Sequence, residues 1–122
     1  MSTGNIIGLV FIGGGLGSVA RFLTGILSLR FYKGEFPIGT LLANFLACLI
    51  LGITLFYLKD KLMQTEWVKY LVIIGFCGGF STFSTFSIET LKLFQDQFFL
   101  MGILNILISL SLGIGILYVL SR

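Results

Sequence analysis

The chain has 122 residues, of which 57% are hydrophobic and 11% are charged, and it contains no histidine. Together with a mean hydropathy of +1.07, this composition excludes a soluble globular domain and indicates an integral membrane protein. The formal net charge of +3 is small and its bases are scattered over the loops, so we expect no nucleic-acid partner.

Four apolar segments can be drawn at roughly 5–29, 38–58, 68–91 and 98–120, each near the ~20 residues that span a bilayer as a helix. We therefore predict an all-α membrane protein with four transmembrane helices in a single domain, residues 1–122. The first segment lacks the basic start of a secretory signal and exceeds its ~7–15-residue apolar core, so we expect it to be retained as a helix.

The first segment carries Gly13 and Gly17, whose small-xxx-small spacing permits close approach of another helix. Arg21 follows within the same apolar run. An arginine buried in a bilayer is costly, which favours a functional or structural partner for it. The alternative is that its long side chain extends to the membrane surface.

The second segment contains one strongly polar residue, Asn44, among leucines. Its amide has two donor hydrogens and an acceptor, so burying it without a partner costs free energy. Two interpretations remain open, a structural hydrogen bond between helices and a contact with a substrate. Thr40 lies one turn earlier on the same face.

The third segment contains the sequence GFCGGFSTFSTF, from Gly75 to Phe86. Gly78 and Gly79 are unfavourable in a helix interior, and the hydroxyl residues after them compete for backbone hydrogen bonds. This predicts a broken third helix. Non-helical backbone at membrane depth is tolerated only where protein buries it or where it lines a polar cavity, so we place the functional site here.

Phe83 and Phe86 share a face if the segment after the break is helical, and such a pair usually serves packing. Here hydroxyl groups surround the rings. Aromatic rings have positive edges, so ring edges that point into a narrow path could attract a small anion. Asn44 and the hydroxyls could replace part of its water, whereas carbonyls freed by the break suit a small cation.

The fourth segment is apolar except for Asn105, Ser109 and Ser111, and serines in membrane helices often bond to their own helix. Cys48 and Cys77 both fall in apolar segments, where a thiol behaves as a small hydrophobe. Two cysteines without histidine cannot complete a four-ligand zinc site.

The basic residues of the loops are nearly balanced between the two sides of the membrane. If the segments alternate, one side receives Lys59, Lys61, Lys69 and Arg122, and the other receives Arg30, Lys33 and Lys92. Because this asymmetry sets orientation, the chain should insert both ways, which predicts an antiparallel dual-topology dimer. The other interpretation is that one strong loop still dominates.

The third-segment motif, followed by Glu89, resembles the fluoride channel family (Fluc, also called CrcB), as do GGGLGSVAR in the first segment and PIGTLLANFLACLILG in the second. The resemblance covers all four helices. It implies a multi-pass protein of the cell membrane, surrounded by lipid. Its antiparallel dimer would have two pores that let cytoplasmic fluoride leave passively and so confer fluoride resistance.

The resemblance also implies roles for particular residues. Phe83 and Phe86 match the paired phenylalanines that line the pores, and Asn44 matches the pore asparagine. The carbonyls of Gly78 and Ser81 match the ligands of a central structural sodium ion, one set from each subunit. The remaining matches are Ser84, Thr85 and Ser109 for the polar track beside the rings, Arg21 for a positive vestibule or a brace of the fold, and Thr40 and Glu89 near the pore ends.

Some positions depart from the family's usual pattern. Ser81 stands where threonine is commoner, which matters little if its carbonyl is the ligand. Ala47 and Cys48 replace a usual Gly-Ser pair, which puts only local packing in doubt. Because the chain keeps both phenylalanines and Asn44, the pattern favours a homodimer over a heterodimer with a paralogous chain.

Two rival functions come from other classes. A proton-coupled small multidrug transporter would need a carboxylate within the membrane, and the nearest candidate, Glu89, lies towards a helix end. A non-transporting accessory protein is the second rival. We expect no enzyme activity, because no serine or cysteine has a plausible general base beside it.

Overall fold

The computed structural model describes residues 1–58 and 65–122, and within them it is helical apart from short connections. Lys59 and Lys61 lie outside the described residues. Four helical spans are long and apolar enough to cross a membrane, namely Thr3–Phe31, Ile38–Tyr57, Glu66–Gln95 and Phe99–Ser121. The predicted all-helical fold with four such spans is therefore confirmed, and the third span runs further than predicted.

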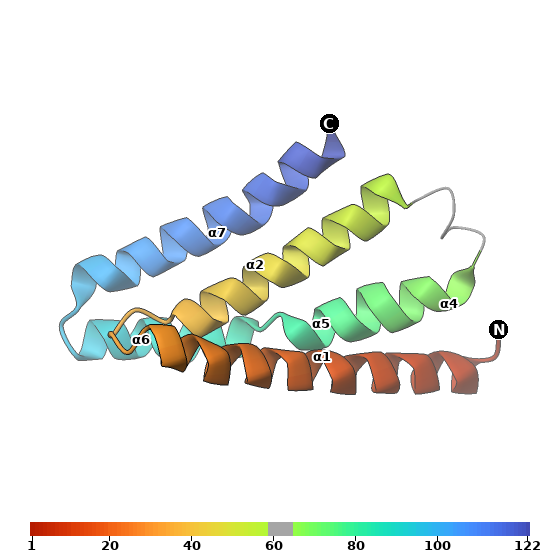
Figure 1. Cartoon of the computed structure of the whole chain (residues 1–122), viewed down its shortest axis with the longest axis horizontal. Coiled ribbons are helices and arrows are strands. Elements are labelled where there is room, and N and C mark those ends of the chain that lie inside the picture. The colour runs from red at the N-terminus through yellow and green to blue at the C-terminus, as the bar shows by residue number, and fades with distance from the viewer. Residues whose placement is uncertain (59–64) are drawn as a thin grey trace.

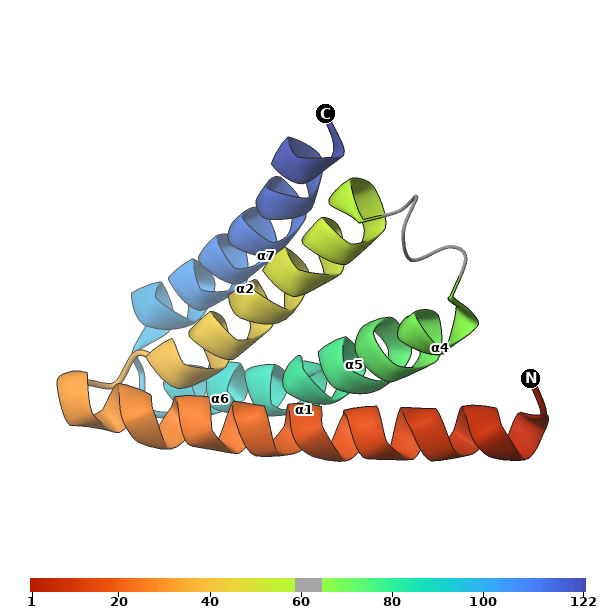
Figure 2. The same cartoon turned by 45° about the vertical axis from the view of Figure 1, so that its right-hand side comes forward.

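The spans form two pairs that open at an angle to each other (Figures 1 and 2). Helix α1 (Thr3–Phe31) packs against η2 (Lys69–Cys77) and α5 (Gly78–Phe80) of the third span. Helix α2 (Ile38–Gly52), which continues into the π-helical η1 (Ile53–Tyr57), packs against α7 (Phe99–Ser121). Successive spans run in opposite directions, as alternating membrane crossings require.

Glycines bring α1 and the third span into backbone contact. A Cβ atom added at Gly13 would meet the carbonyl of Leu71, and one at Gly17 would meet the carbonyl of Phe76. From the other side, a Cβ at Gly79 would meet the carbonyl of Gly14. The small-xxx-small spacing in α1 therefore meets a matching set of glycines, and only residues without a side chain allow this approach.

The third span changes its backbone conformation several times. It begins with α4 (Glu66–Val68), continues through η2 and α5, and resumes as α6 (Phe83–Gln95). Between α5 and α6, Ser81 (φ −80°, ψ 154°) and Thr82 (φ −150°, ψ 117°) are extended. We refer to these two residues as the Ser81–Thr82 linker.

The linker lies within the motif Gly75–Phe86, at the hydroxyl residues that follow the two glycines. Gly78 and Gly79 are helical, as the first two residues of α5. The lack of a side chain at Gly79 instead permits contact with α1. The helix ends at Phe80, and Asn44 binds the backbone of the extended Thr82 that follows. Ser81 Oγ donates to the Cys77 carbonyl at 2.9 Å.

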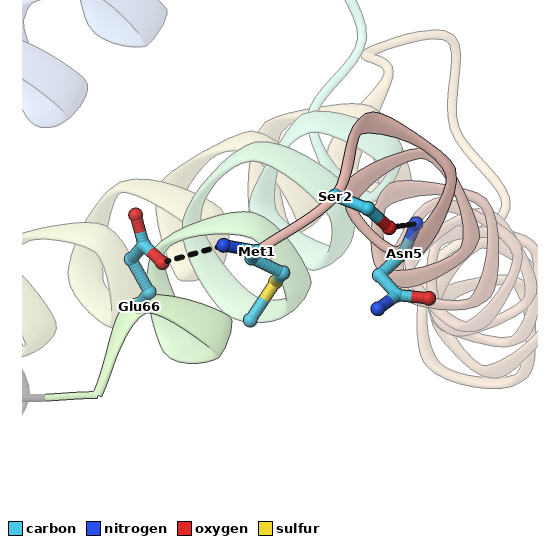
Figure 3. A network of polar contacts seen from close by, with 4 residues as sticks. All are labelled: Met1, Ser2, Asn5 and Glu66. Carbon is cyan, nitrogen blue, oxygen red and sulfur yellow. Dashed lines mark hydrogen bonds and ion pairs between the residues drawn. The ribbon is translucent and has the colours of Figure 1, made fainter.

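The N-terminal end of α1 is tied to the start of the third span (Figure 3). The Met1 amine lies 3.8 Å from Glu66 Oε2, and Ser2 caps the helix by accepting a hydrogen bond from the Asn5 N–H at 3.2 Å. Glu66 is exposed, so this ion pair adds little stability.

A tight turn joins α6 to α7. Gln97 adopts a left-handed conformation (φ 68°), and its N–H donates to the Phe94 carbonyl at 3.1 Å while the Phe98 N–H donates to the Leu93 carbonyl at 2.8 Å. This pair of bonds is a Schellman motif, in which glycine usually occupies the left-handed position. The turn sets α7 antiparallel to α6 and places Asn105 opposite Thr90.

Candidate functional site

A groove of about 310 Å³ lies beside the linker, between α2, α6 and α7. Four predicted site residues from these three helices line it, namely Asn44, Phe83, Phe86 and Ser109. Cys48, Ser81 and Thr82 also line it. The structure thus brings together, on one surface, four residues that the sequence could only propose one at a time.

Asn44 pairs with the backbone of Thr82 through both ends of its amide. The Thr82 N–H donates to Asn44 Oδ1 at 2.6 Å, and Asn44 Nδ2 donates to the Thr82 carbonyl at 3.2 Å. An extended residue in an apolar surrounding needs such partners, because its unpaired backbone groups would otherwise cost free energy. Asn44 therefore forms a structural hydrogen-bond pair between the second and third spans. The second Nδ2 hydrogen of Asn44 is not part of this pair.

The two rings of the motif lie side by side on the first turn of α6. The ring centroids of Phe83 and Phe86 are 6.2 Å apart and the ring planes are inclined by 39°. Phe83 is 81% exposed in the single chain, whereas Phe86 is partly buried. A ring this exposed in a membrane protein is available to lipid or to a second chain.

The N-terminus of α6 opens next to these rings. Thr82 Oγ1 accepts a hydrogen bond from the Thr85 N–H at 3.1 Å and so caps the helix, and Ser84 Oγ lies 3.4 Å from Thr82 Oγ1. The earlier N–H groups of a helix have no intrahelical acceptor by geometry. The positive end of the helix dipole therefore lies beside the groove, where it favours an anion.

A larger recess of about 580 Å³ lies on the other side of the linker. It is lined by the three predicted vestibule residues, Arg21, Thr40 and Glu89, and also by Thr85. Thr82 lines both the recess and the groove. Thr82 of the linker is therefore part of the wall of both hollows.

Arg21 and Glu89, two charged residues that line the recess, differ in their hydrogen bonding. Arg21 Nε donates to the Gly79 carbonyl at 3.1 Å, so its charge lies at the C-terminal end of α5, where the helix dipole favours a cation. Glu89 Oε1 is buried and, among the described residues, has no hydrogen-bond partner. A buried carboxylate oxygen without a hydrogen bond costs free energy, so it needs a proton, a water molecule or an ion as a partner.

The carbonyls of Gly78 and Ser81 have both lost their usual helical donors. In an α-helix the Gly78 carbonyl would accept from the Thr82 N–H, but that group donates to Asn44. The Ser81 carbonyl would accept from the Thr85 N–H, which donates to Thr82 Oγ1 instead. Two hard oxygen atoms from one short stretch are thereby released for other ligands.

Sequence reasoning gave no role to Thr90 and treated Asn105 as a routine polar residue. Both are buried, and Asn105 Nδ2 donates to Thr90 Oγ1 at 2.9 Å. Ser109, placed above on the polar track, donates to Asn105 Oδ1 at 3.2 Å. The available signal was that Asn105 is the most polar residue of an otherwise apolar helix.

Comparison with known proteins finds a family and relatives that match most of this chain. Residues 8–120 match the family model described as CrcB-like protein, Camphor Resistance (CrcB). A relative from Flavobacterium psychrophilum, named fluoride-specific ion channel FluC, is 37% identical over 86% of this chain and 85% of its own length. The relative of that name from Azobacteroides pseudotrichonymphae is 44% identical over 86% of this chain and 84% of its own length.

A third relative, fluoride-specific ion channel FluC 1 of Yersinia pestis, is 44% identical over 75% of this chain and 72% of its own length. The family match over residues 8–120 runs through all four membrane-spanning helices and the linker between α5 and α6. The chain is therefore a multi-pass membrane protein that belongs to the CrcB-like family.

Proposed function

We propose that this protein is a fluoride channel that lets fluoride leave the cytoplasm passively, down its electrochemical gradient. The observation that carries the proposal is the groove, in which Phe83, Phe86, Asn44 and Ser109 meet at the N-terminus of α6. The names of the relatives, all fluoride-specific ion channels, support the choice of ion.

Several parts of the groove supply a weak attraction for a small anion. The edges of the two phenyl rings are positive, and the helix dipole adds partial positive charge. The Asn44 amide hydrogen that does not bind Thr82 can replace part of the hydration shell, whereas Ser84 and Thr85 are not among the residues that line the groove. No single strong cation holds the ion, which suits conduction, because an ion that binds too tightly leaves slowly.

The recess is proposed as the vestibule. Arg21 and Lys92 line it and attract anions, and Thr82 belongs to the lining of both the recess and the groove. Steering of this kind raises the local concentration of an anion and weakens as ionic strength rises. The acidic residues Glu35, Glu89 and Asp96 also line the recess, so its lining is of mixed charge.

The working unit is proposed to be an antiparallel homodimer with two pores. Phe83 and Phe11 are 81% and 80% exposed in the single chain, and the groove is open on one side. An inverted second copy would cover such surfaces, and the balanced loop charges favour insertion in both orientations. Labelling of tagged termini in intact cells tests this, since it should find both termini on both sides of the membrane.

A sodium ion at the centre of that dimer is proposed to be held by the carbonyls of Gly78 and Ser81. The donor set fits, because both oxygens lack their helical partners and carbonyls are hard ligands. Two copies of the pair supply four oxygens. When bound, the ion joins the two third spans, so exchange of sodium for a large organic cation should lower the thermal midpoint of the dimer.

The proposal predicts selective flux. Liposomes that contain the purified protein should release fluoride rapidly and chloride at least ~100-fold more slowly, because the smaller fluoride ion accepts stronger hydrogen bonds and fits a narrower path. A fluoride electrode measures the release. Comparable fluoride and chloride rates would contradict the proposal.

Proton coupling is the second candidate, favoured by Glu89 Oε1, which is buried and has no hydrogen-bond partner within residues 1–58 and 65–122. The same liposomes separate it from a passive channel. Passive flux should be set by the fluoride gradient and the membrane potential alone. If an imposed pH gradient drives fluoride against its own gradient, and Glu89→Gln abolishes that uptake, the coupled mechanism is right.

A further inference from the structure

A buried chain of hydrogen bonds connects α6 to α7. Ser109 Oγ donates to Asn105 Oδ1 at 3.2 Å, Asn105 Nδ2 donates to Thr90 Oγ1 at 2.9 Å, and Thr90 Oγ1 donates to the Phe86 carbonyl at 2.7 Å. Asn105 is 2% exposed and Thr90 is 6% exposed. Both outer members, Ser109 and Phe86, line the groove.

The direction of this chain follows from its last member. A carbonyl oxygen only accepts, so the single hydrogen of the Thr90 hydroxyl is committed to Phe86. The Thr90 oxygen must then accept from Asn105, which turns the amide nitrogen towards Thr90 and the amide oxygen towards Ser109. Since that oxygen also only accepts, Ser109 must be the donor.

This direction determines what Ser109 offers to the groove. Its hydrogen points to Asn105, so the groove meets the lone pairs of the hydroxyl oxygen. Lone pairs do not attract an anion. For Ser109 to donate to fluoride, its hydroxyl must rotate and leave Asn105 Oδ1, a buried acceptor, without a partner.

We propose that Asn105 is a positioning residue that holds the Ser109 hydroxyl in its acceptor orientation and thereby keeps the groove's hold on fluoride weak. The inference rests on the proposed function and deepens it. Weak binding is what a conducting site needs, because the ion must leave as readily as it enters. Asn105 acts through Ser109 and does not touch the ion.

A purely structural role for Asn105 makes a different prediction. Polar residues often join membrane helices by hydrogen bonds, and their loss lowers stability. Such a loss would not depend on whether residue 109 carries a hydroxyl. The dependence of ion binding on Ser109 therefore separates the two roles.

The test compares Asn105→Leu, Ser109→Ala and the double variant in liposomes, with flux measured over a range of fluoride concentrations. Leucine preserves the bulk of asparagine but leaves Ser109 without its acceptor, so its hydroxyl is free to donate to the ion. We expect the half-saturating fluoride concentration to fall about tenfold, as for a hydrogen bond to a charged group. In the double variant the half-saturating concentration should return to the value of the Ser109→Ala variant.

Ser109→Ala is the reference for the double variant, because both proteins lack the hydroxyl that Asn105 orients. A half-saturating concentration in Asn105→Leu/Ser109→Ala that still lies about tenfold below that of Ser109→Ala would overturn the inference. Wild-type protein that passes no fluoride would instead refute the proposed function.

Thr90 provides a second route if Asn105→Leu does not fold. Thr90→Val keeps the shape of the side chain but removes the acceptor that orients the amide, whereas Thr90→Ser keeps the hydroxyl. We expect Thr90→Val to lower the half-saturating concentration in a Ser109-dependent way and Thr90→Ser to behave as wild type. Equal behaviour of the two Thr90 variants would overturn the inference.

Discussion

Phe83→Ile is expected to slow fluoride efflux from loaded liposomes by at least about tenfold, which corresponds to ~1.4 kcal/mol in the barrier. Isoleucine preserves an apolar side chain of similar bulk but has no positive ring edge. Phe83 is also 81% exposed in the single chain, so the change breaks few contacts within the fold. Phe86→Ile should act in the same direction with some added loss of stability, because Phe86 is partly buried.

Phe99→Ile is the matched control. Phe99 also belongs to a ring pair, with its centroid 6.3 Å from that of Phe94, and it is 56% exposed, but it lies at the turn between α6 and α7. Its replacement should leave the flux per folded protein unchanged. Equal slowing by Phe83→Ile and Phe99→Ile would show that bulk or lipid contact matters and ring edges in the groove do not.

Gly17→Ala is expected to destabilise the protein by about 3 kcal/mol or more, or to prevent folding, as overpacking of a rigid contact does. The added methyl group would meet the carbonyl of Phe76 and would lie 2.7 Å from the Phe80 nitrogen. These are backbone atoms, which cannot rotate away as a side chain can. Gel filtration and thermal unfolding in detergent measure the effect.

Gly15→Ala is the control on the same helix. Nothing lies within 4 Å of a Cβ atom at Gly15, so alanine should be neutral or stabilise α1 by up to about 1 kcal/mol. If both variants unfold at the same temperature, Gly17 of α1 does not lie against the backbone of the third span. The two predictions are independent, because one changes ion flux and the other changes folding.

The pattern of apolar residues was enough to predict four helical spans, because a bilayer requires about 20 apolar residues per helix whatever the neighbouring helices do. The position of the linker was harder to predict. Gly78 and Gly79 weaken a helix by propensity, yet both are helical, and Gly79 lies against the backbone of α1. Tertiary contact thus overrides propensity, and the extended residues fall at Ser81 and Thr82.

In the candidate site, too, the sequence indicated some features and tertiary contacts decided others. Its residue types were readable in the chain, since Asn44 and the hydroxyl-rich motif stand out in apolar surroundings. Their partners were not, because a hydrogen bond such as that of Asn44 to Thr82 joins residues 38 positions apart. The Asn105 and Thr90 pair escaped notice for the same reason.

By itself, the sequence determined that this protein lies in a membrane, how many times it can cross it, and which short stretch departs from a regular apolar helix. Only the tertiary structure decided where the backbone leaves the helix, which groups Asn44 satisfies, and which way the Ser109 hydroxyl points. The physical reason is the distance along the chain over which each kind of interaction acts. Hydrophobicity and helix propensity act along the chain, whereas close glycine packing and directional hydrogen bonds form only between segments that the fold brings together.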